Sequence, residues 1–108
     1  MASLDTSEVV EFGPFQLHLQ RRKLFCASDE VQLGSRAMDV LLALARNKGE
    51  LVSKDQLFEA AWPNAYVHES NLKVTVASLR RTLREWSESC EYINTVVGRG
   101  YWLGSIRG

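Results

Sequence analysis

The sequence predicts an α+β fold in which an N-terminal antiparallel sheet is followed by three helices and a C-terminal β-hairpin. Between residues 11 and 33, apolar and polar residues alternate in short runs, which is the period of half-buried strands. Between residues 35 and 86, apolar residues recur every three or four positions in three separate stretches, as on amphipathic helices. Near the C-terminus, two β-rich runs flank Gly98, Arg99 and Gly100, which indicates a tight hairpin.

The length and charge of the chain limit the kinds of protein it can be. A chain of 108 residues is expected to form one domain, which we place at residues 10–106 after a flexible tail at residues 1–9. The formal net charge of zero argues weakly against nucleic-acid binding. However, residues 1–70 hold seven Lys or Arg and ten Asp or Glu, whereas residues 71–108 hold six and three. Positive potential is therefore concentrated in the last third of the chain.

Several classes of function find no support in the composition. No run of eighteen apolar residues is present and the first residues lack the pattern of a signal peptide, so we expect a cytoplasmic segment without membrane contact. Cys26 and Cys90 have no C-x-x-C spacing and are interpreted as ordinary thiols. The two histidines, His18 and His68, are not paired with each other or with a cysteine, so neither a metal nor a cofactor is expected.

The N-terminal sheet is predicted from three short extended runs. Residues 11–19 alternate as one strand, and residues 24–26 and 31–33 form two more around a polar turn at residues 27–30. His18 falls on the polar face of the first strand and is interpreted as a solvated residue rather than a catalytic one.

Two helices are predicted next. Residues 35–47 are apolar around most of the helix, so this is expected to be the central core helix, and Gly49 ends it. Residues 53–56, S-K-D-Q, form a capping box that opens a second helix, which Pro63 stops. Trp62 at its end is predicted to be a core residue rather than a partner contact.

The third helix, predicted over residues 71–86, is the most informative segment. Its apolar residues fall in one stripe that should face the core: Leu72, Val76, Leu79, Leu83 and Trp86. Its basic residues gather on a neighbouring exposed arc with small residues between them: Lys73, Arg80, Arg81 and Arg84, with Ser70, Val74, Ala77 and Ser78. Such a face fits a DNA major groove. The alternative is a solvated surface helix, but random surface charges would mix both signs, and residues 71–84 contain four basic residues and no acid. Replacing Arg80 or Arg81 is therefore expected to weaken DNA binding without loss of stability.

The hairpin places an arginine at its tip. Gly98 and Gly100 permit positive φ on both sides of Arg99, which leaves that side chain exposed and able to reach a minor groove or a phosphate. The alternative is a turn whose middle residue is simply exposed, and the spacing excludes a G-x-G-x-x-G or P-loop phosphate site.

Five blocks of the sequence resemble the OmpR/PhoB-type winged-helix DNA-binding domain. They are L-G-S-R-A-M-D-V-L-L-A-L at residues 33–44, G-E-L-V-S-K-D-Q-L at 49–57, W-P at 62–63, N-L-K-V-T-V-A-S-L-R-R-T-L at 71–83 and G-R-G-Y at 98–101. The resemblance covers about residues 10–106. It implies a winged helix-turn-helix in which residues 70–84 are the recognition helix in the major groove. Residues 96–103 are then the wing, on the adjacent minor groove or the backbone.

Carried over by position, the resemblance implies two sets of contact residues. The DNA contacts are Asn71, Lys73, Val74, Ala77, Ser78, Arg80, Arg81, Arg84 and Arg99. The loop that faces RNA polymerase is residues 63–69, with Asn64, Tyr66, His68 and Glu69 as its contact residues. The chain departs from the family at Val97, where many members carry an arginine.

The sequence thus predicts sequence-specific binding of double-stranded DNA for transcription regulation in a bacterial cytoplasm, and no enzymatic activity. A homodimer or a tandem arrangement on DNA is also expected. With Met1 only about ten residues before the first strand, the domain is expected to be N-terminal in a one-component regulator with its sensor C-terminal. The alternative function is a protein-interaction module that uses residues 63–69 and has little DNA affinity.

Overall fold

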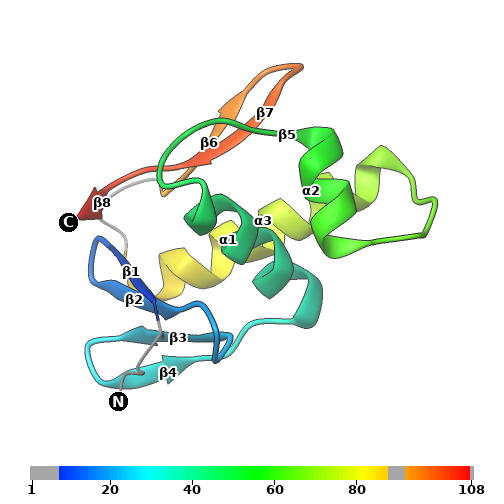
Figure 1. Ribbon diagram of the computed structural model, residues 1–108. Coiled ribbons are helices and arrows are strands. Elements are labelled where there is room, and N and C mark those ends of the chain that lie inside the picture. The colour runs from blue at the N-terminus through cyan, green and yellow to red at the C-terminus, as the bar shows by residue number, and fades with distance from the viewer. Residues whose placement is uncertain (1–7, 88–91, 108) are drawn as a thin grey trace, which may run out of the picture.

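The N-terminal part of the molecule is an antiparallel sheet that also includes the C-terminal end of the chain. The computed structural model describes residues 8–87 and 92–107, so most of the predicted N-terminal tail, and Cys90, lie outside the described residues. Five strands pair in the order β4-β3-β2-β1-β8. Their bounds are β1 (Val9–Phe12), β2 (Phe15–His18), β3 (Lys23–Cys26), β4 (Asp29–Val31) and β8 (Ile106–Arg107). The two ends of the domain therefore lie next to each other (Figure 1).

Two strand predictions are wrong in this sheet. Strand β4 covers Asp29–Val31 rather than residues 31–33, because the turn before it is shorter than the predicted residues 27–30. Residues 11–19 do not form a single strand, because the chain reverses at Gly13 and Pro14 and the two halves pair as β1 and β2. The alternation of apolar and polar residues continues on both sides of the turn, so a search for a period of two does not reveal the turn. Phe12 and Phe15 consequently lie opposite each other, with ring centroids 5.2 Å apart.

The central helix α1 (Ser35–Arg46) occupies the position that the sequence predicts. Seven of its side chains are buried, and its more polar stripe, which includes Arg36 and Arg46, is the less buried side. The helix ends at Arg46, one residue earlier than predicted, and Asn47 caps it by donating from its side-chain amide to the carbonyl of Ala43 at 2.7 Å. In Figure 1, α1 lies at the centre of the molecule, and it packs against α2, α3 and β7.

Helix α2 (Lys54–Ala61) begins with the predicted capping box. The backbone amide of Gln56 donates to Ser53 Oγ at 3.1 Å, and the backbone amide of Ser53 donates to Gln56 Oε1 at 2.9 Å. Ser53 also belongs to β5 (Val52–Ser53), a short strand that the sequence does not predict. Trp62, predicted to be a core residue, is only partly buried and packs with Phe58 on the edge of the core.

Helix α3 (Glu69–Trp86) is held by its apolar stripe. Leu72, Val76, Leu79 and Leu83 are at most 2% exposed, as the sequence predicts. Trp86 is 40% exposed, so its inclusion in the buried stripe is wrong. The helical period places it correctly on the wheel, but the core covers the helix only as far as Leu83.

The C-terminal hairpin is β6 (Ile93–Val96) and β7 (Gly100–Leu103), and it joins β5 in a sheet of order β5-β7-β6. Figure 1 shows this hairpin extending at one end of the molecule, on the opposite side of α1 and α3 from strands β3 and β4. Within the described ranges, no helix has both the length and the apolar character needed to cross a bilayer.

Candidate nucleic-acid interface

The side of α3 that faces away from the core forms a continuous exposed surface. Because the apolar stripe is buried, the rotation of the helix about its own axis is determined. Val74 and Arg81 lie on the far side of the helix from Leu79, and Val74 is 68% exposed. The exposed residues that the sequence assigns to DNA contact on this helix are Asn71, Lys73, Val74, Ala77, Ser78, Arg81 and Arg84, and we call them the outer face of α3.

Arg80 differs from the other predicted contact residues because its guanidinium is bound to the hairpin. Its Nε and Nη2 donate to the carbonyl of Ile93 at 3.1 and 2.8 Å, and Nη2 also donates to Thr95 Oγ1 at 2.6 Å. Its Cζ lies 6.0 Å from the centre of the Tyr101 ring. The expectation that Arg80 is an exposed residue without a structural role is therefore wrong. On the helical wheel Arg80 stands beside the buried stripe, and the sequence does not show that a strand carbonyl lies within its reach.

The turn of the hairpin presents Arg99 to solvent. The Arg99 amide donates to the carbonyl of Val96 at 2.9 Å, which closes the turn. Gly98 has a φ of 78°, as predicted, but Gly100 does not have a positive φ. Val97 is 90% exposed beside Arg99. The tip is also tied to the second helix, since the Lys54 amide donates to the carbonyl of Arg99 at 3.3 Å.

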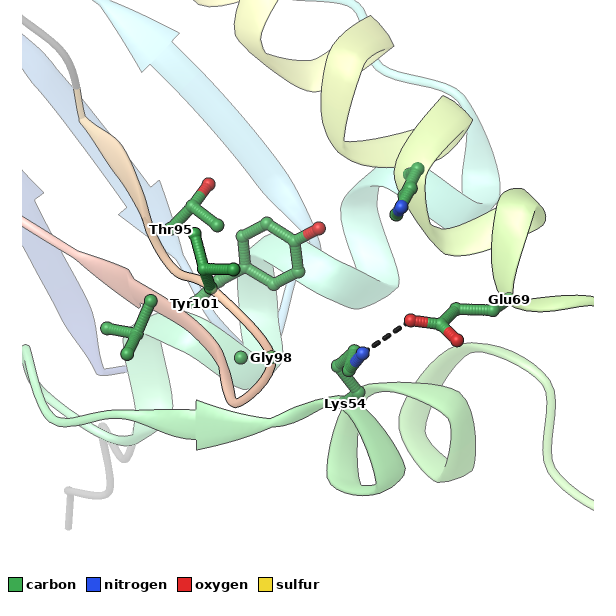
Figure 2. Close-up of a pocket in the computed structure, with 9 residues that line it drawn as sticks. Lys54, Glu69, Thr95, Gly98 and Tyr101 are labelled. Atoms are coloured by element: carbon green, nitrogen blue, oxygen red, sulfur yellow. Dashed lines mark hydrogen bonds and ion pairs between the residues drawn. The ribbon is translucent and has the colours of Figure 1, made fainter.

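A cleft of about 200 Å³ separates the start of α3 from the hairpin. Figure 2 shows Lys54 from α2 and Glu69 from α3 pointing toward each other across it, with Tyr101 and Thr95 on the hairpin side. The Lys54 ammonium forms an ion pair with the Glu69 carboxylate, and Lys73 lines the same cleft. The cleft therefore lies between the outer face of α3 and the exposed turn at residues 97–99.

The predicted polymerase-contact residues divide into two places. Asn64 and Tyr66 are exposed at an open hollow beside α2, and Tyr66 is 99% exposed. That hollow also contains two aromatic and two acidic side chains: Phe58, Trp62, Asp55 and Glu59. His68 is instead the N-cap residue of α3, and Glu69 is the first residue of that helix. The structure thus brings Asn64 and Tyr66 together and places Glu69 with Lys54.

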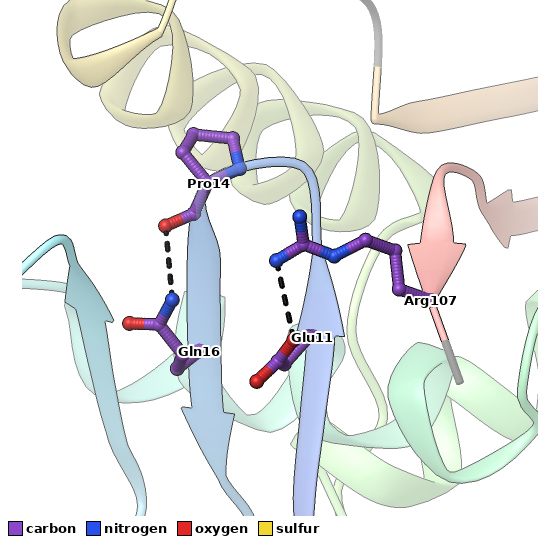
Figure 3. A network of polar contacts seen from close by, with 4 residues as sticks. All are labelled: Glu11, Pro14, Gln16 and Arg107. Carbon is purple, nitrogen blue, oxygen red and sulfur yellow. Dashed lines mark hydrogen bonds and ion pairs between the residues drawn. The ribbon is translucent and has the colours of Figure 1, made fainter.

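The basic residue nearest the C-terminus is part of the N-terminal sheet. Arg107 on β8 donates to Glu11 on β1 at 3.2 Å, and Gln16 on β2 donates to the carbonyl of Pro14 at 3.3 Å (Figure 3). The positive charge of Arg107 is therefore used to hold β8 against β1.

Within the described part of the chain, no three His, Cys, Asp or Glu side chains gather as metal ligands.

Comparison with known proteins gives one consistent result. The family described as "Transcriptional regulatory protein, C terminal" matches residues 28–103. The chain is 34% identical over 96 residues to the transcriptional regulatory protein PhoP of Escherichia coli K12, and 33% identical to the virulence transcriptional regulatory protein PhoP of Salmonella typhi. These matches cover 88% of the chain but only 43% and 42% of the two relatives.

The fold is similar to that of solved DNA-binding domains. The DNA-binding domain of E. coli CadC superposes with a TM-score of 0.76 at 27% identity, covering 91% of this chain and 94% of that one. The Klebsiella pneumoniae RstA DNA-binding domain in complex with the RstA box gives a TM-score of 0.72 at 23% identity, covering 89% and 96%. The predicted winged helix-turn-helix fold is thereby confirmed.

Proposed function

The chain belongs to the OmpR/PhoB-type family of transcriptional regulatory winged-helix domains, and from this premise we propose that it binds duplex DNA sequence-specifically to regulate transcription in the bacterial cytoplasm. The observation that carries the proposal is the outer face of α3. Between Lys73 and Arg84 the helix carries basic and small residues and no acid, and its other side is fixed to the core. Basic residues on such a face meet phosphates or guanine, while small residues let the helix approach base edges closely. We propose a binding function rather than an enzymatic one.

The position of the hairpin supports a second DNA contact. One sugar-phosphate strand always separates a major groove from the neighbouring minor groove. With α3 in the major groove, that strand passes the cleft beside α3, and the turn at residues 97–99 reaches the minor groove beyond it. An arginine is attracted to a narrow minor groove by its negative potential, which suits the exposed Arg99.

Salt dependence of binding tests this proposal. In a mobility-shift titration of the chain against duplex promoter DNA, the logarithm of the affinity is expected to fall linearly with the logarithm of salt concentration, because phosphate contacts release counterions. A second retarded band in the same gel would indicate two copies bound, as a homodimer or in tandem. Absence of any salt-dependent shift would contradict DNA binding.

We expect opposite results when the two adjacent arginines of α3 are replaced. Arg81→Ala should weaken binding to a preferred duplex by about 1–3 kcal/mol, the range for a good base contact, with the melting temperature unchanged. Arg80→Ala should instead lower stability, because it removes charged hydrogen bonds to Ile93 and Thr95, each contributing about 1.5–3 kcal/mol. Thermal denaturation and anisotropy titrations on both variants measure the two effects. Equal melting temperatures for the two variants would contradict the structural role of Arg80, and an unchanged affinity in Arg81→Ala would contradict the outer face.

Replacing Arg99 tests the hairpin contact. Arg99→Ala is expected to weaken binding about equally for most DNA sequences and to flatten the plot of log affinity against log salt by about one unit, because one cationic contact with a phosphate or the minor groove is lost. Its side chain is exposed, so the melting temperature should hardly change. A slope identical to that of the unaltered chain would show that the turn does not touch DNA.

A second candidate function uses the hollow beside α2. Tyr66 is 99% exposed next to Phe58 and Trp62, and exposed aromatic side chains of this kind are enriched in protein interfaces. We propose RNA polymerase as the partner of this surface, with Asn64 and Tyr66 as its contacts. If the chain is only a protein-interaction module, this surface remains its binding site and the salt-dependent DNA shift is absent.

A further inference from the structure

The ion pair between Lys54 and Glu69 occupies the place where a DNA backbone is expected to pass. Lys54 is the first residue of α2 and Glu69 the first residue of α3, and both side chains line the cleft beside the hairpin. The tip of the hairpin is fixed next to Lys54 by the bond from the Lys54 amide to Arg99. With α3 in one DNA groove and the tip of the hairpin in the next, the sugar-phosphate backbone between the two grooves faces the Lys54 ammonium. That ammonium is bound to a carboxylate of the protein itself (Figure 2).

We propose that Glu69 acts as an internal competitor of the DNA phosphates for Lys54 and so limits sequence-independent binding of the chain. This inference rests on the proposed DNA-binding function. A carboxylate and a phosphate oxygen are both anionic hydrogen-bond acceptors, so either can bind the same ammonium. While Glu69 holds it, Lys54 adds no net positive charge to the surface that approaches DNA. Glu69 thereby becomes a specificity-determining residue on the DNA side rather than a polymerase contact.

The surroundings of the pair allow this exchange. The Lys54 side chain is 31% exposed and the Glu69 side chain 51% exposed, so water and an incoming phosphate can reach both. Exposed ion pairs contribute about 0–1 kcal/mol to stability, so the pair is easily replaced by another contact of similar strength. The hydrogen bond between the two groups raises the pKa of Lys54 and lowers the pKa of Glu69, so both stay charged near neutral pH. The positive charge of Lys73, on the next turn of α3, also lowers the pKa of Glu69.

Helices α2 and α3 are held in place by interactions other than the ion pair between Lys54 and Glu69. α2 already has a complete capping box through Ser53 and Gln56, so its start does not depend on Lys54. α3 is fixed by its buried stripe. Replacing Glu69 by the isosteric Gln therefore removes one charge while the two helices keep their other anchors.

The test compares the salt dependence of binding to a random-sequence duplex. Glu69→Gln is expected to steepen the slope of log affinity against log salt by about 0.9, the value for one added phosphate contact. At about 0.1 M salt this corresponds to binding about eightfold tighter than the unaltered chain. The double variant Lys54→Gln/Glu69→Gln, in which an uncharged pair replaces the ion pair, should return to the original slope.

A second surface pair of the same kind provides the matched control. Lys23 and Glu30 form an ion pair of 3.3 Å on strands β3 and β4, with side chains 47% and 40% exposed. Glu30→Gln makes the same change in net charge and releases a lysine on the N-terminal sheet, so its slope should not change. The proposal is overturned if Glu69→Gln steepens the slope of log affinity against log salt no more than Glu30→Gln does, or if the double variant keeps the steeper slope.

The same measurements distinguish failure of the proposed DNA binding from failure of the proposed role of Glu69. If the unaltered chain and every variant show no salt-dependent binding to duplex DNA, the proposed function itself fails. If the unaltered chain binds with a salt slope and Glu69→Gln has that same slope, DNA binding stands and only the role of Glu69 is wrong.

Discussion

Replacing Leu79 by Ala is expected to lower the free energy of unfolding by about 2–5 kcal/mol, the usual loss when a buried leucine side chain is removed. Leu79 has no exposed surface and lies at the centre of the stripe that holds α3 on the core. DNA binding should weaken only to the extent that the chain unfolds. Urea denaturation gives the midpoint, and Leu51→Ala is the matched control, because Leu51 is 39% exposed and its loss should cost less than about 0.5 kcal/mol. A Leu79→Ala midpoint equal to that of Leu51→Ala would mean that α3 is rotated relative to the structure.

The second large effect is expected at Gly100. A Cβ atom on this residue would lie 2.0 Å from the carbonyl oxygen of Val52 and 3.0 Å from Ser53 Cα, both backbone atoms of the paired strand β5. Relief of the clash requires β7 to separate from β5, so Gly100→Ala should cost about 3 kcal/mol, near the upper end for overpacking. For a domain of this size that loss lowers the melting temperature by about 10 °C or more.

Gly34→Ala is the control for this effect. Nothing lies within 4 Å of a Cβ atom at Gly34, and its φ of −65° suits any residue. If thermal denaturation gives Gly100→Ala and Gly34→Ala the same melting temperature, β5 and β7 do not approach as closely as the structure has them.

The helices could be predicted from sequence because their signals are local. The stripe from Leu72 to Leu83 follows the helical period, and the Ser53 and Gln56 side chains bond to amides only three residues away. Each of these patterns lies within a few turns of chain, so the sequence contains the whole interaction. The exposed side of α3 follows directly, because burial of one side fixes the other.

The features that sequence analysis missed depend on residues that are distant in the chain. Strands β5 and β8 are two residues long and exist only because β7 and β1 lie beside them. Arg80 binds a carbonyl 13 residues away, and Lys54 meets Glu69 across 15 residues, so neither partner could be read from the helical wheel. The sequence predicts Gly100 to be a turn glycine, but its lack of a side chain is needed for the close approach of β5. In each case a tertiary contact gives the residue a role that its own element does not reveal.

The central claim is that the outer face of α3 and the turn at residues 97–99 bind duplex DNA. Backbone amide shifts in NMR spectra, followed while duplex promoter DNA is added to the chain, test it most directly, because every described non-proline residue reports separately. The largest changes are expected at Lys73, Val74, Ala77, Ser78, Arg81 and Arg99, with little change at Phe25 and Glu30 on the N-terminal sheet. Changes confined to the N-terminal sheet or to the hollow around Tyr66 would contradict the claim.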